Sequence, residues 1–229
     1  MPVLALDTSA AVAVSLIADD GTTLAARVVR EERRHAEQLA PMIAEVLAAT
    51  GTDRSALTAV VAGTGPAPFT GLRVGLVTAR TLGLALGIPA HGVCSLDALA
   101  AQAVADLALP AGTEVLVVAD ARRREVYWAR YRAIAGVDPV ELVAGPGVAS
   151  ADQVAADGLA RGAVVVGPGA SLYPDALTPA EGAAATCDPA VLARLAAART
   201  ALGEALPTEP LYLRRPDVMP LARRKRALG

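Results

Sequence analysis

The side chains with the clearest potential for chemistry lie where two predicted strands end. Asp7, Thr8 and Ser9 close the first apolar strand, and Asp120 and Arg122 close the strand that opens the second half of the chain. Carboxylates and hydroxyls beside a turn can hold a phosphate group through Mg²⁺ and backbone donors. The two similar strand ends favour a phosphate-type cleft, with Asp7 and Asp120 facing each other across it. The alternative is that these residues simply form turns.

A pair of glycines further along the chain extends this interpretation. Gly167 and Gly169 follow another apolar strand, and a residue without a Cβ lets a phosphate approach the backbone closely. The hairpin after Asp7 has no such glycine, which weakens the prediction. Gly-Pro-Gly is also an ordinary turn sequence, so both interpretations stay open.

Metal and thiol chemistry are both disfavoured. His35 precedes the first predicted helix, but Leu39 stands one turn later, where a second metal ligand would be needed. His91, Cys94 and Asp97 are close in sequence, and a thiol nucleophile would need an activated thiolate. Apolar neighbours favour a structural cysteine instead. We therefore expect no metal and assign no catalytic residue.

A basic segment raises the question of RNA binding. Arg122–Arg124 precede Tyr127, Trp128 and Tyr131, and arginines with aromatic rings can bind RNA by phosphate contact and stacking. A basic hairpin whose aromatic residues fill the core explains the same pattern, and we favour that explanation. A second basic run, Arg223–Arg226, resembles a solvated tail that contacts RNA phosphates at most.

Hydrophobic alternation and turn residues predict the elements that position these side chains. A first series has strands at 3–6, 12–17 and 22–29, a helix at 37–49, a strand at 57–62, a helix that starts near 70, a strand at 90–93 and a helix capped by Ser95. A second series has strands at 114–119, 125–131, 140–143 and 163–166, a short helix capped by Ser150 and a helix begun by Asp188 and Pro189. The repeated order predicts an α/β duplication with units at 1–110 and 111–229.

Two helices of the first unit carry more apolar surface than a single core contact requires. The helix at 72–86 is apolar on opposite sides, and only Arg73 and Arg80 lie between them. A helix without a polar face is either buried all round or covered by a partner. The helix at 37–49 adds an apolar stripe beside small residues, Ala40, Ala44 and Ala48. The predicted docking surface consists of Leu39, Met42, Ile43, Val46, Arg73, Val74, Val77, Thr78 and Thr81.

Composition excludes several classes of protein. The net charge of -2 gives no global electrostatic case for nucleic acid binding. The two cysteines lack metal or redox spacing, as expected for a reducing cytosol. No signal peptide is expected because Asp7 interrupts the first apolar run, and the uncharged run 81–96 contains Pro89. We therefore expect a cytoplasmic protein without membrane segments.

Several blocks of the sequence resemble the TsaB (YeaZ) family. They are residues 4–9 (LALDTS), 65–75 (GPAPFTGLRVG), 87–89 (GIP), 95–99 (SLDAL), 120–122 (DAR) and 210–214 (PLYLR). The second block is the most specific, and the C-terminal half matches loosely. Ala67 stands where serine is common in this loop.

The resemblance implies an actin/Hsp70-like (ASKHA) fold of two RNase H-like subdomains with mixed sheets. It also implies a non-catalytic subunit of the complex that forms N6-threonylcarbamoyladenosine beside the anticodon of ANN-decoding tRNAs. The catalytic homologue TsaD binds its metal through a His-x-x-x-His helix, of which this chain retains only His35. The implied partners are TsaD, the ATPase TsaE, tRNA through the complex, and a second copy of the chain as a homodimer.

The cleft at Asp7 and Asp120 would then be vestigial, with no cofactor, or at most weak nucleotide binding in the complex. An ATP-dependent phosphotransferase or ATPase that acts alone is the main alternative, because one superfold hosts several functions. A peptidase is the least supported alternative, because the sequence offers neither a metal pair nor a nucleophile with its base.

Overall fold

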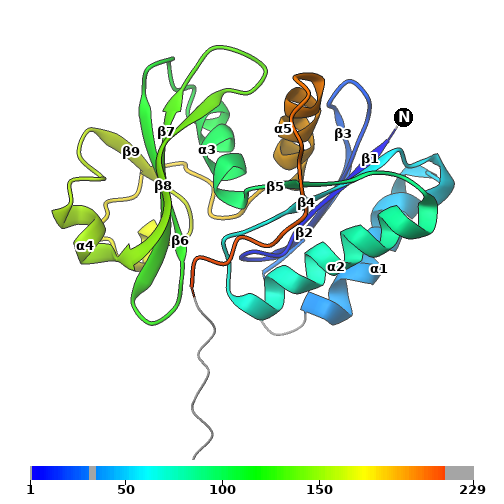
Figure 1. The fold of residues 1–229 in the computed structure, drawn as a ribbon, viewed down its shortest axis with the longest axis horizontal. Helices are drawn as coiled ribbons and strands as arrows, with labels where there is room; N and C mark the ends of the chain where they lie inside the picture. Colours follow the sequence, from blue (N-terminus) through cyan, green and yellow to red (C-terminus); the bar gives the residue numbers. More distant parts are fainter. Residues whose placement is uncertain (1, 31–34, 215–229) are drawn as a thin grey trace, which may run out of the picture.

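The computed structural model describes residues 2–30 and 35–214 of the 229-residue chain (Figure 1). The first series of elements follows the predicted order, with boundaries within a few residues. It comprises β1 (Val3–Asp7), β2 (Val12–Ile17), β3 (Thr23–Val29), α1 (His35–Thr50), β4 (Ala59–Gly63), α2 (Phe69–Leu86), β5 (Ala90–Val93) and α3 (Ser95–Asp106), with a 3-10 turn at Arg54–Ala56.

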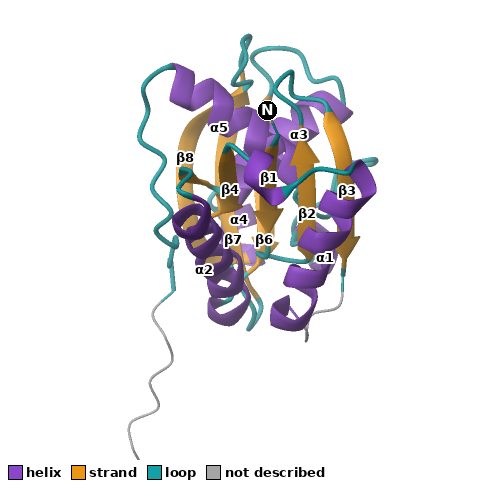
Figure 2. Cartoon of the chain, turned by 90° about the vertical axis from the view of Figure 1, so that its right-hand side faces the viewer, coloured by secondary structure: helices purple, strands orange, loops and turns teal. Residues whose placement is uncertain are grey.

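These strands form one mixed sheet in the order β3-β2-β1-β4-β5. β1, β2 and β3 are antiparallel neighbours, whereas β4 and β5 continue the sheet parallel to β1. Helices α1 and α2 lie side by side on one face, as Figure 2 shows. Leu4, Leu6 and Leu16 from the strands pack there against Val46 and Leu76 from the helices.

The second series repeats the order in a smaller form. It comprises β6 (Glu114–Asp120), β7 (Glu125–Ala133), β8 (Val140–Ser150), α4 (Ala151–Ala156), β9 (Ala163–Val166), a 3-10 turn at Ala170–Leu172 and α5 (Pro189–Ala201). Its sheet has the order β8-β7-β6-β9, which matches the first sheet without the fifth strand. The predicted duplication is therefore present, and β8 runs further than the sequence indicated.

The last helix of each series packs against the sheet of the other series. α5 contacts β1, β2, β4 and β5, whereas α3 contacts β6, β7 and β8. The two helices also touch each other and share one core between the sheets, which contains Leu96, Leu99, Leu192 and Leu195. The packing thus links the two series, and the division into units at 1–110 and 111–229 stays a prediction.

A charged cluster joins these crossing helices. The Arg199 guanidinium on α5 donates to Asp97 on α3 and to Asp138 in the β7–β8 turn, each at 2.7 Å. Tyr131 on β7 donates its hydroxyl to the other oxygen of Asp97, also at 2.7 Å. Burial and the Asp97 charge raise the pKa of Tyr131 well above its ordinary value. Asp97 therefore holds α3, α5 and the second sheet together.

Helix capping follows the predicted chemistry at two positions and departs from it at a third. The Asp188 carboxylate caps α5 by accepting from the Ala190 N–H, and the Ser150 hydroxyl accepts from the Gln153 N–H at the start of α4. Ser95 does not cap α3; Cys94 occupies that position and makes no side-chain cap bond. The predicted cap at Ser95 was wrong because its hydroxyl binds Asp7 instead.

Among residues 2–30 and 35–214, no helix combines the length and apolar character needed to cross a bilayer.

Candidate functional site

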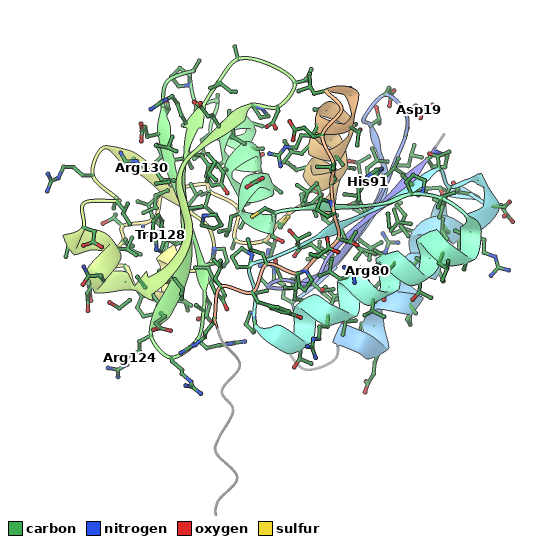
Figure 3. The ribbon with its side chains drawn as sticks, in the orientation of Figure 1. Asp19, Arg80, His91, Arg124, Trp128 and Arg130 are labelled. Atoms are coloured by element: carbon green, nitrogen blue, oxygen red, sulfur yellow. The ribbon has the colours of Figure 1, made fainter. Side chains whose placement is uncertain are left out.

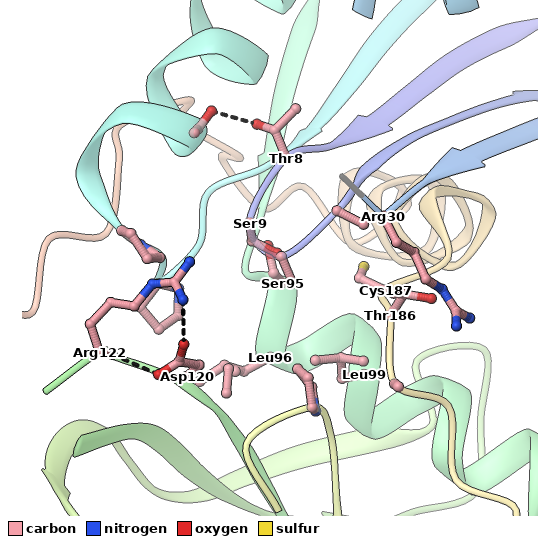
Figure 4. Close-up of a pocket in the computed structure, with 18 of the residues that line it drawn as sticks. Thr8, Ser9, Arg30, Ser95, Leu96, Leu99, Asp120, Arg122, Thr186 and Cys187 are labelled. Atoms are coloured by element: carbon pink, nitrogen blue, oxygen red, sulfur yellow. Dashed lines mark hydrogen bonds and ion pairs between the residues drawn. The ribbon is translucent and has the colours of Figure 1, made fainter. Parts of the chain in front are cut away.

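A pocket of about 600 Å³ opens between the two halves of the molecule. Figure 4 shows Thr8 and Ser9 from the β1–β2 hairpin on one side and Asp120 and Arg122 on the other. Leu96 and Leu99 of α3 contribute an apolar surface to the same pocket. The structure thus gathers Thr8, Ser9, Asp120 and Arg122 around one space, as the strand-end pattern predicted.

Asp7 does not line this pocket. Its side chain is 2% exposed, and its Oδ1 accepts from the Ser9 N–H at 2.8 Å and from the Ser9 hydroxyl at 2.5 Å. Its Oδ2 accepts from Ser95 at 2.6 Å. A Cβ on Gly63 would lie 1.9 Å from that oxygen, so only glycine fits above it. Asp7 therefore fixes the β1 end against α3 and does not face Asp120 across the cleft.

The neighbouring Thr8 is equally committed to the scaffold. Its hydroxyl donates to the Gly71 carbonyl at 2.8 Å and accepts from the Gly75 N–H at 3.2 Å, which ties α2 to the end of β1. Gly75 is required there, because a Cβ would lie 2.5 Å from the Thr8 oxygen. The Thr8 hydroxyl thus positions α2.

The charged groups at the pocket belong mainly to its rim. Arg122 pairs with Asp120 at 3.1 Å and its backbone N–H donates to the other Asp120 oxygen at 2.7 Å. Arg30 lines the pocket as a second cation, and Thr70 and Gly71 bring the first turn of α2 to it. Because a helix N-terminus carries partial positive charge, cations and helix together favour an anionic group over a cationic one.

Gly167 and Gly169 have a different role from the predicted one. Gly167 has φ +96°, and a Cβ there would lie 2.5 Å from the Val118 carbonyl oxygen. A Cβ on Gly169 would meet the Ala119 backbone at 3.0 Å. Both glycines allow the loop to pack closely against β6, and it is Pro168 between them that lines the pocket.

The residues considered for metal and thiol chemistry are partly or fully buried where they are described. Burial raises the pKa of the Cys94 thiol far above its ordinary value, with a further contribution from the Asp97 carboxylate. Burial likewise raises the pKa of Cys187 and lowers that of His91. Within the described ranges, no three His, Cys, Asp or Glu side chains gather as a metal site would require. The His35 side chain lies outside the described residues.

The predicted docking surface divides between the two helices. Leu39, Met42, Ile43 and Val46 of α1 are buried in the core against the first sheet. Their assignment to a partner surface was wrong, because a single apolar stripe on a surface helix packs on its own sheet. Ala40, Ala44 and Ala48 are among the exposed residues of α1.

Helix α2 does expose apolar side chains. Val77 is 60% exposed and Leu84 87% exposed, and Thr81 is also exposed. Val74 and Thr78 are half-buried beside them, while Leu72, Leu76 and Ala79 face the core. The helix thus has one covered and one uncovered apolar side.

One further feature was not predicted from the sequence, the extended segment 204–214 that crosses from the first sheet to the second. Leu206 accepts from the Gly92 N–H of β5 at 2.9 Å, and the Leu211 N–H donates to the Thr64 carbonyl at 2.9 Å. We call this segment the C-terminal strap. Pro207 and Pro210, which exclude a helix, were the only local signal.

The strap also holds the two arginines of α2. Arg80 donates to the Thr208 hydroxyl at 2.8 Å and to the Thr208 carbonyl at 2.6 Å. Arg73 donates to the Tyr212 hydroxyl at 3.0 Å, with its guanidinium 5.9 Å from the ring centre. The strap therefore borders the exposed side of α2.

Two mixed sheets with the same strand order, crossed helices and a pocket between them define a two-part RNase H-like protein of the actin/Hsp70-like (ASKHA) class. The predicted fold class is confirmed. The sequence profile of the family described as "TsaD: tRNA N6-adenosine threonylcarbamoyltransferase" matches residues 28–167. The solved structure of YeaZ from Pseudomonas aeruginosa superposes with a TM-score of 0.76 at 29% identity, covering 93% of this chain and 100% of that one.

Sequence relatives agree with this match. The chain is 43% identical to the uncharacterized protein Rv3421c of Mycobacterium tuberculosis over 96% of its own length and 95% of the relative. It is 35% identical to the Escherichia coli "tRNA threonylcarbamoyladenosine biosynthesis protein TsaB" over 58% of its length. It spans about half of some relatives, 55% of that TsaB and 56% of a Mycobacterium leprae protein. The chain belongs to the TsaB (YeaZ) family.

Proposed function

We propose that this chain is the non-catalytic, TsaD-binding subunit of the machinery that forms N6-threonylcarbamoyladenosine in tRNA. Membership of the TsaB (YeaZ) family supports a role in this pathway. The observation that carries the docking role is the uncovered apolar side of α2, where Val77 is 60% exposed. Apolar surface of this kind marks a site for a partner.

The pocket chemistry supports a subunit without its own catalysis. A phosphotransferase of this superfold would need a carboxylate in the cleft that is available to a metal–phosphate group. Asp7 is buried with Ser9 and Ser95 as partners, and Asp120 pairs with Arg122 at the rim. Nucleotide binding by the pocket is proposed to be weak at most, and confined to the complex.

The docking surface is proposed to combine α2 with the small residues of α1. Val74, Val77, Thr78, Thr81 and Arg73 supply the α2 part. Ala40, Ala44 and Ala48 of the adjacent α1 would let a partner helix approach closely, near the lower end of the usual 8–10 Å spacing. In the absence of TsaD, the same surface would pair with a second copy of the chain around a two-fold axis.

A pair of matched substitutions tests this surface. Val77→Glu should abolish binding to a TsaD homologue and dissociate the homodimer, since a carboxylate cannot be buried unpaired. Val137→Glu is the control, because Val137 is also exposed, at 79%, but lies in the β7–β8 turn. Size-exclusion chromatography with light scattering measures the homodimer of each variant, and calorimetric titration measures its binding to the TsaD homologue. Normal TsaD binding by Val77→Glu would rule out this surface.

A reconstituted reaction tests the function itself. The reaction mixture contains the chain, a TsaD homologue, TsaE, tRNA and the threonylcarbamoyl-AMP adduct in a buffer that mimics the cytoplasm. The modified adenosine is measured by mass spectrometry. Modification should need the chain and fail with Val77→Glu. An ATPase or phosphotransferase activity of the isolated chain that is lost in Asp120→Asn would instead support the alternative enzyme.

A further inference from the structure

The turn between β6 and β7 contains three consecutive arginines in a conformation that disfavours them. Arg122, Arg123 and Arg124 have φ values of 64°, 53° and 64°, all in the left-handed region. The Ala121 N–H donates to the Glu125 carbonyl at 3.0 Å, and the Glu125 N–H donates to the Arg122 carbonyl at 3.0 Å, which closes the turn. Glycine or asparagine adopts this backbone more easily, so the turn itself does not explain the arginines.

All three side chains are exposed at the tip of the hairpin. Figure 3 shows Arg124 pointing away from the body of the molecule. Arg122 lies at the rim of the pocket, where it pairs with Asp120. The turn therefore places cationic groups from the pocket mouth outward to solvent.

The C-terminal strap places one more arginine against this turn and bonds to another on α2. Arg214 donates to the Ala121 carbonyl at 2.9 Å and pairs with Glu125 at 3.0 Å. Two residues earlier, Tyr212 accepts from Arg73 of α2. We call the five residues Arg73, Arg122, Arg123, Arg124 and Arg214 the arginine rim. Within this group Arg122 pairs with Asp120 and Arg214 pairs with Glu125, whereas the whole chain carries a net charge of -2.

The sequence beyond the strap is also positively charged. Residues 215–229 contain five basic side chains and one acidic side chain, and they follow directly on Arg214. The arginine rim is thus followed in sequence by a further basic segment, in a chain whose net charge is -2.

The chemistry of this rim fits a phosphodiester backbone. Guanidinium groups bind phosphate oxygens in a planar, two-pronged manner, and a row of them follows a row of phosphates. Two of the aromatic residues after the turn are not available to stack on bases, because Tyr127 is 4% and Tyr131 1% exposed. The third, Trp128, is half-buried and packs against the core of the second sheet. Contact with phosphate but not with bases gives binding that depends on salt and hardly on sequence.

We propose that the arginine rim binds the backbone of an RNA strand that passes the mouth of the pocket. This inference deepens the proposed function, since it gives this chain a direct contact with the RNA substrate of the complex. The arginine rim and the proposed docking surface share only Arg73, so the two proposals can be tested separately.

RNA binding to the full chain, alone and in complex with a TsaD homologue, tests the proposal. The test variant is Arg122→Gln/Arg123→Gln/Arg124→Gln. The control is Arg27→Gln/Arg54→Gln/Arg161→Gln, which makes the same charge change at arginines on β3, in the 3-10 turn before β4 and after α4. Fluorescence anisotropy with a tRNA and an unrelated RNA of equal length is measured at several salt concentrations.

The test variant should bind both RNAs at least about tenfold more weakly at low salt, and its plot of log K against log salt should be shallower by about 2. The control should lose less than about twofold. Equal losses in both variants, an unchanged slope, or no salt-dependent binding by the unmodified chain and complex would overturn the proposal. Equal binding of polyglutamate would overturn the assignment to RNA in favour of an acidic protein.

Failure of this proposal is distinguishable from failure of the proposed docking role. The arginine variant should still bind TsaD, whereas Val77→Glu should lose TsaD and keep the RNA binding of the isolated chain. A thermal unfolding curve confirms that the arginine variant is folded. Arg123→Gly, which relieves the left-handed backbone, should unfold no earlier than the unmodified chain.

Discussion

Helices α1 and α2 lie next to each other on the same face of the first sheet, yet their apolar residues have different fates. The single stripe of α1, including Leu39 and Val46, is buried against the sheet, and its other side carries Glu37 and Glu45. α2 buries Leu72 and Leu76 in the same way and has a second apolar side that stays exposed. The comparison shows that a first stripe belongs to the core, and only a second one is available for a partner.

The largest expected effect comes from charging the α1 stripe. Val46 is 0% exposed within the core of α1, α2 and the sheet. Val46→Asp should cost at least about 3 kcal/mol of unfolding free energy, because an unpaired carboxylate is forced into an apolar core. Val77→Asp on α2 is the matched control and should change stability by about 0.5 kcal/mol or less. Urea denaturation measures both, and similar values for the pair would contradict the comparison.

The inner side of α2 should behave like α1. A Cβ at Gly75 would lie 2.5 Å from the Thr8 hydroxyl and 3.2 Å from Leu6. Gly75→Val should therefore lower the unfolding free energy by about 2 kcal/mol through overpacking. Ala85→Val, on the exposed side of the same helix, carries the same β-branched penalty without the clash and should cost well under 1 kcal/mol. A tolerated Gly75→Val would mean that Thr8 does not hold α2 in place.

These differences also show what the sequence determines. Alternating apolar residues with glycine at the turns located the strands, because each side of a strand has a distinct environment. The two apolar sides of α2 were likewise visible, since periodicity alone reveals them. Where the apolar stripe of α1 packs was not visible in the sequence. A stripe that packs on its own sheet and one that packs on another protein have the same spacing.

Contacts between distant residues were beyond sequence reasoning. Ser95 has the chemistry of a helix cap, but a carboxylate 88 positions away takes its hydroxyl. The C-terminal strap has no periodicity, and its bond from Arg73 to Tyr212 spans 139 positions. The predicted cleft was found through its strand ends, whereas the burial of Asp7 depends on Gly63 and Ser95, which belong to other elements.

The exposed side of α2 should affect association more than folding. Thr81→Arg places a charge in the proposed interface and should weaken binding to a TsaD homologue by about tenfold or more. The unfolding free energy should change by less than about 0.5 kcal/mol. Thr178→Arg, at an exposed threonine in the loop before α5, serves as the control. If both variants bind TsaD equally well, this side of α2 is not an interface.

The smallest expected effect concerns the strap beside α2. Tyr212→Phe removes the hydroxyl that accepts from Arg73 and keeps the ring beneath the guanidinium. The bond is exposed, so the global unfolding free energy should fall by no more than about 0.5 kcal/mol. The neighbouring Leu211 N–H, which donates to the Thr64 carbonyl, should nevertheless exchange with solvent roughly twofold faster, because local opening responds to local contacts. Hydrogen exchange read by mass spectrometry measures this. Unchanged exchange at Leu211 would show that the bond from Leu211 to Thr64 is enough to fix the strap. The strap would then lie beside the exposed side of α2 without being held by Arg73.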